Sequence, residues 1–348
     1  MSTTGRIGIK EVAAAAGVSV TTVSHALNGK GRLPEETRQH VRRVAEQLAY
    51  RPSPAARNLG GRKTGLLGLL ISQPPGSSVR FSDFAYFTEL MMAASTTAMK
   101  AGYALVLTTA EHALGASLPI PLDGALIIDP VGDDALVAEL IRSETPIVTT
   151  GRILGDHADR PWVDNDHAAG VRSVLTHLSR RGARRIALLS NPAVMSYTAD
   201  VEAAYRAWCL EQSMTPLVRP VGADLTESAG YAAARKLLSL KQPPDAIYAT
   251  YDRVGVGALL AARAAGIAVP NELLLAVTAT GSGGEPTRPS LTGLSLHPDQ
   301  IGARAAELLI DLVEERTPPS LHVIVPTRLV PRTSTKRLHD AEAADPPA

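Results

Sequence analysis

Four short polar side chains recur at three- and four-residue intervals in one segment of the chain; they are Thr21, Ser24, His25 and Asn28. Side chains with this spacing share one face of a helix. Hydroxyl, imidazole and amide groups on an exposed helix face can hydrogen-bond the base edges in the major groove of DNA. The chemistry that this segment predicts is therefore the reading of a base sequence.

The neighbouring residues predict a helix-turn-helix that would position this face. A first helix over about 9–16 would end at Gly17, a residue suited to the left-handed backbone of a helix end. Ser19 would begin the second helix by accepting a hydrogen bond from the amide of Thr21 or Thr22. The apolar residues expected to pack the two helices together are Ile9, Val12, Ala13, Val18, Val23 and Leu27.

A third helix is predicted to begin near residues 34–36, where two acidic residues suit its positive end. Its apolar positions follow the helical period. They are Val41, Val44, Ala45 and Leu48.

The positive charge of the chain is concentrated at its amino-terminal end. Residues 1–63 contain eleven lysines and arginines and four glutamates, a net charge of +7, whereas the whole chain carries +1. A basic segment of this kind favours contact with nucleic-acid phosphates. A solvated basic surface, or a three-helix module that binds another protein, is the alternative interpretation.

The segment 51–63 is predicted to be a linker that contains one short helix. Ser53 would cap this helix, Pro54 would be its first residue, and Gly60 and Gly61 would end it. Two turns are too short to form a stable helix alone in water. We therefore expect this helix to become ordered only on DNA.

Apolar strand-like runs alternate with helical stretches from residue 65 onward, which predicts parallel sheets covered on both faces. Such folds bind ligands beyond the carboxyl ends of their strands. The expected strands are 65–72, 103–109, 124–129, 146–150, 185–190, 245–250, 273–278 and 322–326. The expected helices lie near 83–101, 133–143, 166–180, 198–213, 226–240, 253–265 and 298–315.

The composition argues against several other classes of protein. Cys209 is the single cysteine, so an internal disulfide and a cysteine-based zinc site are excluded, and we expect it to pack in the core. The nine histidines are scattered and the common catalytic motifs are missing, so we expect no enzyme, no metal site and no cofactor. Residues 1–10 lack the apolar core of a signal peptide, and no run of 18 apolar residues occurs, so a cytoplasmic protein without a membrane span is expected.

The stretch from Ile9 to Leu59 resembles the DNA-binding head of the lactose-repressor (LacI/GalR) family of bacterial regulators. The matching pieces are VAAAAGVSVTTVSHALN, EETRQHVRRVAEQLAYRP and AARNL. Later pieces match the family in the same order, among them LDGALII, PWVDNDHAAG, GARRIALLS, PDAIYATYDRVGVGAL, RPSLTGLSLHP and PTRLVPRTST.

The resemblance implies an N-terminal all-α helix-turn-helix head plus an α/β two-lobed effector domain like a periplasmic binding protein. It implies a homodimer on near-palindromic operator DNA that regulates transcription, as a repressor or an activator, under control of a small-molecule effector. A solute-binding protein is the remaining alternative. The expected domains are 1–50, the linker 51–63 and the effector domain 64–335, followed by a disordered tail over 336–348. Lobe 1 is expected over about 64–165 and 294–322, and lobe 2 over about 166–293 and 323–335.

Residue roles in DNA binding are implied only by the resemblance. Val20, Thr21, Ser24 and His25 would face bases, and Ser19, Thr22, Asn28 and Tyr50 would contact phosphates. Leu59, flanked by Arg57 and Asn58, would wedge into the minor groove, with an ordinary core leucine as the alternative. Most relatives carry arginine where this chain has His25, so the operator half-site is not expected to match theirs.

The resemblance also places effector-binding positions. Tyr86 and Asp252 would contact the effector, and Asp164 would either contact it or act as a hinge residue. Val201 and Ala279 replace a family arginine and a family aspartate, which argues against a sugar bound in the usual way. Tyr197, Asp200, Tyr205 and Trp208 would build a substitute pocket for an apolar or cationic effector.

Overall fold

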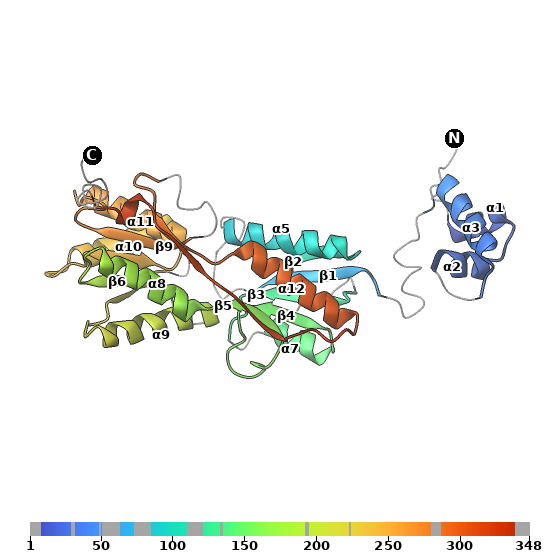
Figure 1. The fold of residues 1–348 in the computed structure, drawn as a ribbon, viewed down its shortest axis with the longest axis horizontal. Coiled ribbons are helices and arrows are strands. Elements are labelled where there is room, and N and C mark those ends of the chain that lie inside the picture. Colours follow the sequence, from blue (N-terminus) through green and yellow to red (C-terminus); the bar gives the residue numbers. More distant parts are fainter. Residues whose placement is uncertain are drawn as a thin grey trace, which may run out of the picture. The chain divides into compact units, whose positions relative to one another are not determined.

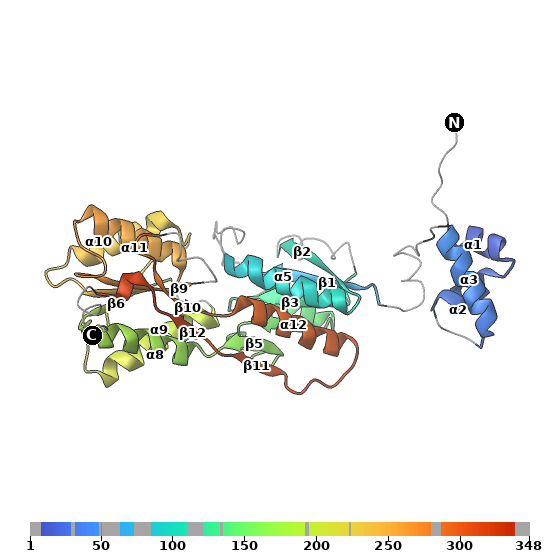
Figure 2. The same cartoon turned by 45° about the horizontal axis from the view of Figure 1, so that its top comes forward.

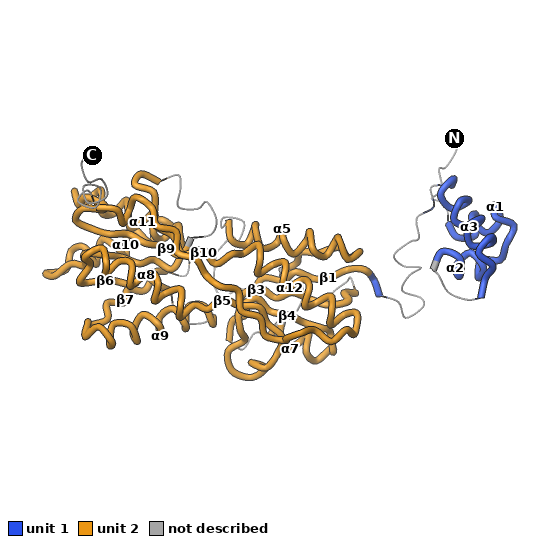
Figure 3. The backbone as a smooth tube through the Cα atoms, in the orientation of Figure 1, with its two compact units in different colours: residues 1–64 blue, residues 65–348 orange. Residues whose placement is uncertain are grey.

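The computed structural model describes residues 8–28, 32–48, 50, 63–72, 85–109, 121–132, 135–191, 195–222, 224–279 and 287–337 (Figure 1). The chain divides into two compact units, residues 1–64 and residues 65–348 (Figure 3). The tail prediction falls mostly on residues 338–348, which lie outside the described residues.

The described residues of the first unit form three helices, α1 (Ile9–Ala16), α2 (Val20–Asn28) and α3 (Glu35–Gln47). Gly17 ends α1 with a φ of 66°, a left-handed conformation that costs glycine nothing because it has no Cβ. The three helices enclose one small apolar core, as the spacing of the sequence predicts. Its buried members are Val12, Ala13, Ala16, Val23, Ala26, Val41, Val44 and Ala45.

The second unit contains two six-stranded sheets, and the first sheet defines lobe 1. Its strands are all parallel, in the order β11-β5-β4-β3-β1-β2. Helices α5 and α12 cover one face of this sheet and α7 covers the other (Figures 1 and 2). The strands are β1 (Leu66–Ile71), β2 (Ala104–Thr109), β3 (Gly124–Ile128), β4 (Ile147–Thr150), β5 (Trp162–Asn165) and β11 (His322–Val325), and the helices are α5 (Ala85–Lys100), α7 (Ala135–Arg142) and α12 (Pro298–Val313).

The second sheet defines lobe 2 and has the order β12-β10-β9-β8-β6-β7, with β12 antiparallel. Helices α10 and α11 cover one face, and α8 and α9 cover the other (Figure 2). The strands are β6 (Ile186–Ser190), β7 (Val218–Pro220), β8 (Ala246–Ala249), β9 (Leu274–Ala279), β10 (Thr292–Ser295) and β12 (Arg328–Val330). The helices are α8 (His167–Arg180), α9 (Ser196–Glu211), α10 (Glu227–Leu238), α11 (Asp252–Ala264) and the 3₁₀ turn η2 (Thr333–Thr335).

Four short strands were not expected from the sequence: β5, β7, β10 and β12. Each has three or four residues, and β7 and β12 carry an arginine and stay partly exposed. An apolar run, the feature that reveals the buried strands, is too short in these segments to be recognised.

The chain crosses between the lobes after β5, after β10 and after β11. Since β10 pairs with β9 in lobe 2 and β11 pairs with β5 in lobe 1, the last two crossings follow Ser295 and Val325. These crossings lie two and three residues after the approximate lobe boundaries 293/294 and 322/323 that the sequence predicts. The side chain of Asn165 joins the crossings, because its Nδ2 donates to the Leu296 carbonyl at 3.0 Å and to the Val325 carbonyl at 2.9 Å.

In each lobe two helices pack very closely at a glycine, because glycine has no side chain to hold them apart. A Cβ on Gly302 of α12 would lie 2.2 Å from the Leu90 carbonyl oxygen of α5. A Cβ on Gly257 of α11 would lie 2.1 Å from the Glu227 carbonyl oxygen of α10. None of the described helices is long and apolar enough to cross a membrane.

Candidate functional site

Helix α2 presents the predicted polar face away from the core of the first unit. Val23 and Ala26 are fully buried on one side of the helix. On the other side Val20 is 41% exposed and Thr21 is exposed, while Ser24 and His25 are half-buried. This face therefore offers its hydroxyl and imidazole groups to a partner in solution.

Ser19 begins α2 in the manner that its position predicts. Its Oγ accepts a hydrogen bond from the Thr22 amide at 3.0 Å and lies 2.8 Å from the Thr22 hydroxyl. Of the two amides considered, the capped one is that of Thr22. The cap fixes the first turn of α2, and so it fixes the direction in which Val20 and Thr21 project.

Some of the predicted DNA-binding residues are only partly described. Asn28 is the last residue of α2, and its side chain lies outside the described part of the chain. Tyr50 is half-buried and packs against the core of the first unit. Arg57, Asn58 and Leu59 lie outside the described residues, as does the predicted linker helix.

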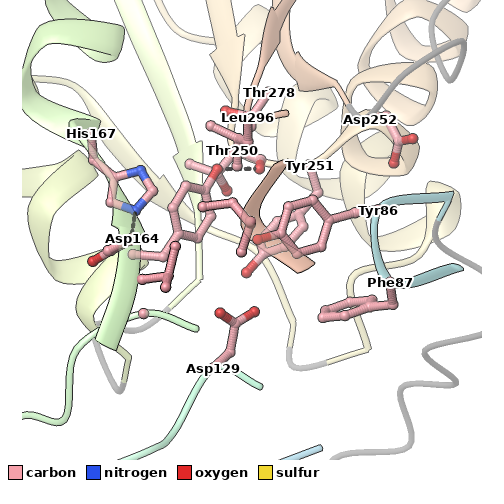
Figure 4. A pocket seen from close by; sticks show the side chains of 14 residues that line it. Tyr86, Phe87, Asp129, Asp164, His167, Thr250, Tyr251, Asp252, Thr278 and Leu296 are labelled. Atoms are coloured by element: carbon pink, nitrogen blue, oxygen red, sulfur yellow. Dashed lines mark hydrogen bonds and ion pairs between the residues drawn. The ribbon is translucent and has the colours of Figure 1, made fainter. Parts of the chain in front are cut away.

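A cavity lies between the two lobes, at the carboxyl ends of both sheets (Figure 4). The volume of the cavity that the centre of a water molecule can occupy is about 50 Å³. This is space for a few waters or a small ligand. Lobe 1 lines it with Tyr86, Phe87, Asp129, Gly151, Val163, Asp164 and Ile301. Lobe 2 and the crossing after β10 line it with His167, Tyr197, Thr250, Tyr251, Asp252, Thr278 and Leu296.

Aromatic rings form much of the cavity wall. The Tyr86 and Phe87 rings meet edge to face with centroids 5.2 Å apart. Tyr197 meets His167 at 5.0 Å and Tyr251 at 5.8 Å, again edge to face. Burial raises the pKa of the Tyr86, Tyr197 and Tyr251 hydroxyls, so these tyrosines stay neutral at physiological pH.

Asp164 is a buried carboxylate with several partners. Its Oδ1 accepts from the Asn165 amide at 2.8 Å and from His167 Nε2 at 2.9 Å, and its Oδ2 lies 3.2 Å from Arg152 Nε. Arg152 follows β4 in lobe 1 and also pairs with Asp200 of α9 in lobe 2. Its backbone amide donates to the Ser196 hydroxyl of α9 at 3.0 Å. Arg152 therefore joins the two lobes beside the cavity.

Asp129 follows β3 and differs from Asp164 in its surroundings. In the described part of the chain, no side chain or amide donates a hydrogen bond to its carboxylate. Burial, followed by the charge of Asp164, raises the pKa of Asp129 from 3.8 to about 7. Figure 4 shows its carboxylate directed toward the space beside the Tyr86 and Tyr251 rings.

The structure places some predicted effector residues on the cavity and others elsewhere. Tyr86, Asp164, Tyr197 and Asp252 line the cavity. Asp200 does not line it; its carboxylate is paired with Arg152 instead.

The predicted cluster on α9 requires correction. Val201, Tyr205 and Trp208 are at most 3% exposed and pack in the core of lobe 2, because they recur on the face of α9 that lies against the sheet. The Tyr205 hydroxyl donates to the Ile186 carbonyl and accepts from the Leu217 amide, both at 2.8 Å. Cys209 is buried in the same core, as expected. Ala279 is the last residue of β9, and its side chain lies outside the described residues.

Sequence reasoning missed Asp129, Arg152, His167, Thr250 and Thr278 as residues at or beside the cavity. All except His167, the first residue of α8, lie at or just after the carboxyl end of a strand. The rule that ligands bind at these ends would have identified them as candidates. Among the described residues no group of three or more acidic, histidine or cysteine side chains could hold a metal ion.

A polar helix face on a basic three-helix unit, joined to two lobes that enclose a cavity lined by aromatic and acidic side chains, is the arrangement of a DNA-binding regulator controlled by a small molecule. The family model of the lacI family of bacterial regulatory proteins matches residues 8–53, and the periplasmic binding protein-like domain matches residues 175–335. The transcriptional regulator CelR of Thermobifida fusca is 30% identical over 94% of this chain and 97% of its own length. The chain belongs to the LacI family of transcriptional regulators.

Solved structures agree on the fold. The complex of CelR with cellobiose has a TM-score of 0.69 at 28% identity and covers 94% of this chain and all of that one. The lac repressor dimer bound to operator and the anti-inducer ONPF has a TM-score of 0.78 and covers 95% of this chain and 99% of that one. At 22% identity the lac repressor supports the fold alone.

Proposed function

We propose that this chain is a repressor that binds a near-palindromic operator as a homodimer and changes its affinity for that operator when an effector occupies the cavity between the lobes. The observation that carries the proposal is the polar face of α2 in a unit of net charge +7. The dimeric lac repressor on operator DNA supports the assembly by analogy of fold.

In this proposal phosphate contacts supply affinity and α2 supplies sequence recognition. Ser19, Thr22, Asn28 and Tyr50 would contact the backbone, and Val20, Thr21, Ser24 and His25 would face bases. Arg57, Asn58 and Leu59 would enter the minor groove, with Leu59 as the wedge. An imidazole offers fewer hydrogen bonds to guanine than a guanidinium, so the half-site would differ from that of relatives with arginine at this position.

The effector would be bound by Tyr86, Asp164, Tyr197 and Asp252, all of which line the cavity. It would act by favouring one angle between the lobes over another, since a ligand shifts a conformational equilibrium only through a difference in affinity. The protein would act in the cytoplasm on the chromosome, as a regulator and not as an enzyme.

Selection of the purified protein against a random pool of duplex DNA tests this proposal. We expect enrichment of a near-palindrome whose half-sites lie about one helical turn apart. A His25→Ala variant should lose the preference at one or two positions of each half-site. His157→Ala, which changes an exposed histidine of lobe 1, is the matched control and should select the same palindrome as the wild type.

Failure to enrich any sequence, both alone and with a small-molecule extract added, would contradict the proposal. A reporter gene placed behind the selected operator then measures the direction of control. Lower expression in the presence of the protein supports repression, and higher expression would show an activator.

A further inference from the structure

Among the described residues that line the cavity, the groups that carry a full charge are acidic. The described lining residues include Asp129, Asp164 and Asp252 but no lysine or arginine. Arg152 offsets the charge of Asp164 from beside the cavity, but an anionic effector would meet Asp129 and Asp252 with no lysine or arginine among the described lining residues. Because ions are costly to bury without a partner of opposite charge, this cavity disfavours anions.

Two of the three carboxylates already have partners. Asp164 accepts hydrogen bonds from Asn165 and His167 and is paired with Arg152. Asp252 is the first residue of α11, where the helix dipole favours a negative charge, and it accepts from the Arg253 amide at 2.7 Å. Asp129 is left as the carboxylate that faces the cavity with no donor in the described part of the chain (Figure 4).

The neutral polar atoms at the cavity offer further acceptors. With its Nε2 hydrogen directed to Asp164, His167 keeps Nδ1 as an acceptor if the ring is neutral. This Nδ1 and the Thr250 hydroxyl have no hydrogen-bond partner among the described residues, and both residues are at least 95% buried. Buried polar atoms of this kind normally find a partner, which a bound ligand would supply.

The tyrosines of the cavity offer a ligand their aromatic rings more than their hydroxyl groups. The Tyr197 hydroxyl donates to the Thr250 carbonyl at 2.6 Å, so its hydrogen is not available to a ligand. The rings of Tyr86, Tyr197 and Tyr251 all line the cavity. Figure 4 shows the Tyr86 and Tyr251 rings beside the Asp129 carboxylate. Aromatic rings beside a carboxylate are the usual surroundings of a bound ammonium group, because the ring quadrupole attracts cations.

We propose that the effector is a small organic amine, whose ammonium group donates to the Asp129 carboxylate while its apolar body packs between the Tyr86, Tyr197 and Tyr251 rings. The inference rests on the proposed function of the cavity as the effector site. A sugar fits less well, because its hydroxyls need donors as well as acceptors and the described lining is rich in acceptors. Bound cellobiose in CelR makes a sugar the alternative that the test must include.

The test is calorimetric titration of the full-length protein with three pairs of amine and alcohol of equal size: ethylamine with ethanol, butylamine with butanol, and benzylamine with benzyl alcohol. Cellobiose is titrated alongside. We expect at least one amine to bind roughly tenfold or more tightly than its alcohol, the strength expected of a charge-assisted hydrogen bond with a cation–π contact. Equal binding within every pair, no binding of any amine, or binding of cellobiose alone would overturn the proposal.

Asp129→Asn should abolish the preference for the amine with little change in alcohol binding. Asp156→Asn, which removes an exposed carboxylate of lobe 1, should keep the preference and controls for the loss of one negative charge. In the wild type the amine affinity should fall as the pH is lowered from 8 to 5.5, because Asp129 becomes protonated below pH 7. The Asn variant should lack this dependence, and an unchanged pH profile in that variant would contradict the assignment of Asp129.

Operator binding by the same preparation, measured without amine, separates the two proposals. A protein that selects an operator but binds no amine is a regulator with another class of effector. A protein that binds amine but selects no operator keeps this cavity assignment, and its function in DNA binding is then the part that fails.

Discussion

The α2 face and the cavity between the lobes, the two sites of the proposed function, differ in how exposed and how hydrogen-bonded their side chains are. On α2 the polar groups come from one short segment and are wholly or partly exposed to solvent. In the cavity they come from segments as distant as Tyr86 and Leu296, and most are buried and hydrogen-bonded already. Substitution on α2 can therefore change specificity with little effect on the fold, whereas substitution in the cavity alters a network that also holds the lobes together.

The dependence of binding affinity on salt concentration should differ most strongly between these two sites. Raising the salt from 50 to 200 mM should weaken operator binding by roughly a thousandfold or more, because the basic head releases counterions from phosphates. Binding of benzylamine in the cavity should change by less than about threefold, since buried charges are screened far less. Fluorescence titrations at several salt concentrations measure both slopes. Equal slopes would mean that the cavity is as open to solvent as α2.

The ionisation of Asp129 should have the next largest effect. Its pKa is raised to about 7 in the folded protein from an ordinary 3.8. The folded state therefore loses stability as the pH rises from 4 to 7, where the carboxylate ionises in an unfavourable site. Asp129→Asn removes this cost and should stabilise the protein by about 2–4 kcal/mol at pH 8 and hardly at all at pH 4.

Urea unfolding of the wild type and of Asp129→Asn at both pH values measures this difference. Asp156→Asn should change neither curve, because its side chain is exposed. Equal stability of the wild type and Asp129→Asn at pH 8 would show that the Asp129 carboxylate is well solvated in the folded state.

Close helix packing gives a third test, confined to the second unit. Gly302→Ala places a methyl group 2.2 Å from the Leu90 carbonyl oxygen, so α5 and α12 must move apart, at a cost of about 1–3 kcal/mol. Thermal unfolding measures the loss. Gly132→Ala is the matched control, because no atom of the described residues lies within 4 Å of its added methyl group. A similar loss in both variants would argue against the packing explanation.

The smallest effect is expected at the cap of α2. Ser19→Ala removes the acceptor of the Thr22 amide and should destabilise α2 by about 1 kcal/mol. Hydrogen exchange over residues 20–28 of the full chain should become faster, with exchange in lobe 2 unchanged. Thr21→Ala should leave hydrogen exchange nearly as in the wild type. Equally faster exchange in both variants would contradict the assignment of Ser19 as the cap of α2.

The helices of the head could be predicted closely because their signals are local. Gly17, Ser19 and the spacing of Val41, Val44 and Ala45 each act within one or two turns, and the structure confirms all of them. The long apolar strands could be predicted for the same reason. The short strands β5, β7, β10 and β12 could not, because their partners lie far away in the sequence and their own residues carry too weak a pattern.

The cavity could be predicted in position but only partly in composition. Tyr197, Val201, Tyr205 and Trp208 follow one helical stripe on α9, and this spacing alone does not show where the stripe leaves the core. Tyr197 reaches the cavity from the first turn, while the other three pack against the sheet. The partners of Asp164 illustrate the same limit, because Arg152 lies on another strand end and Asp200 lies in the other lobe.

The Asn165 amide also determines how the second unit can bend. By donating to the carbonyls of Leu296 and Val325 it ties the three crossings together, so we expect any rotation of one lobe against the other to take place about this point. The cavity lies close to these crossings, because Leu296 lines it. The amino end of β1 lies at the opposite end of the lobe 1 sheet, roughly 20 Å from its carboxyl end for a strand of six residues. If an effector rotates the lobes about these crossings, we expect the amino end of β1, which follows residues 1–64 in the chain, to move further than the residues that line the cavity.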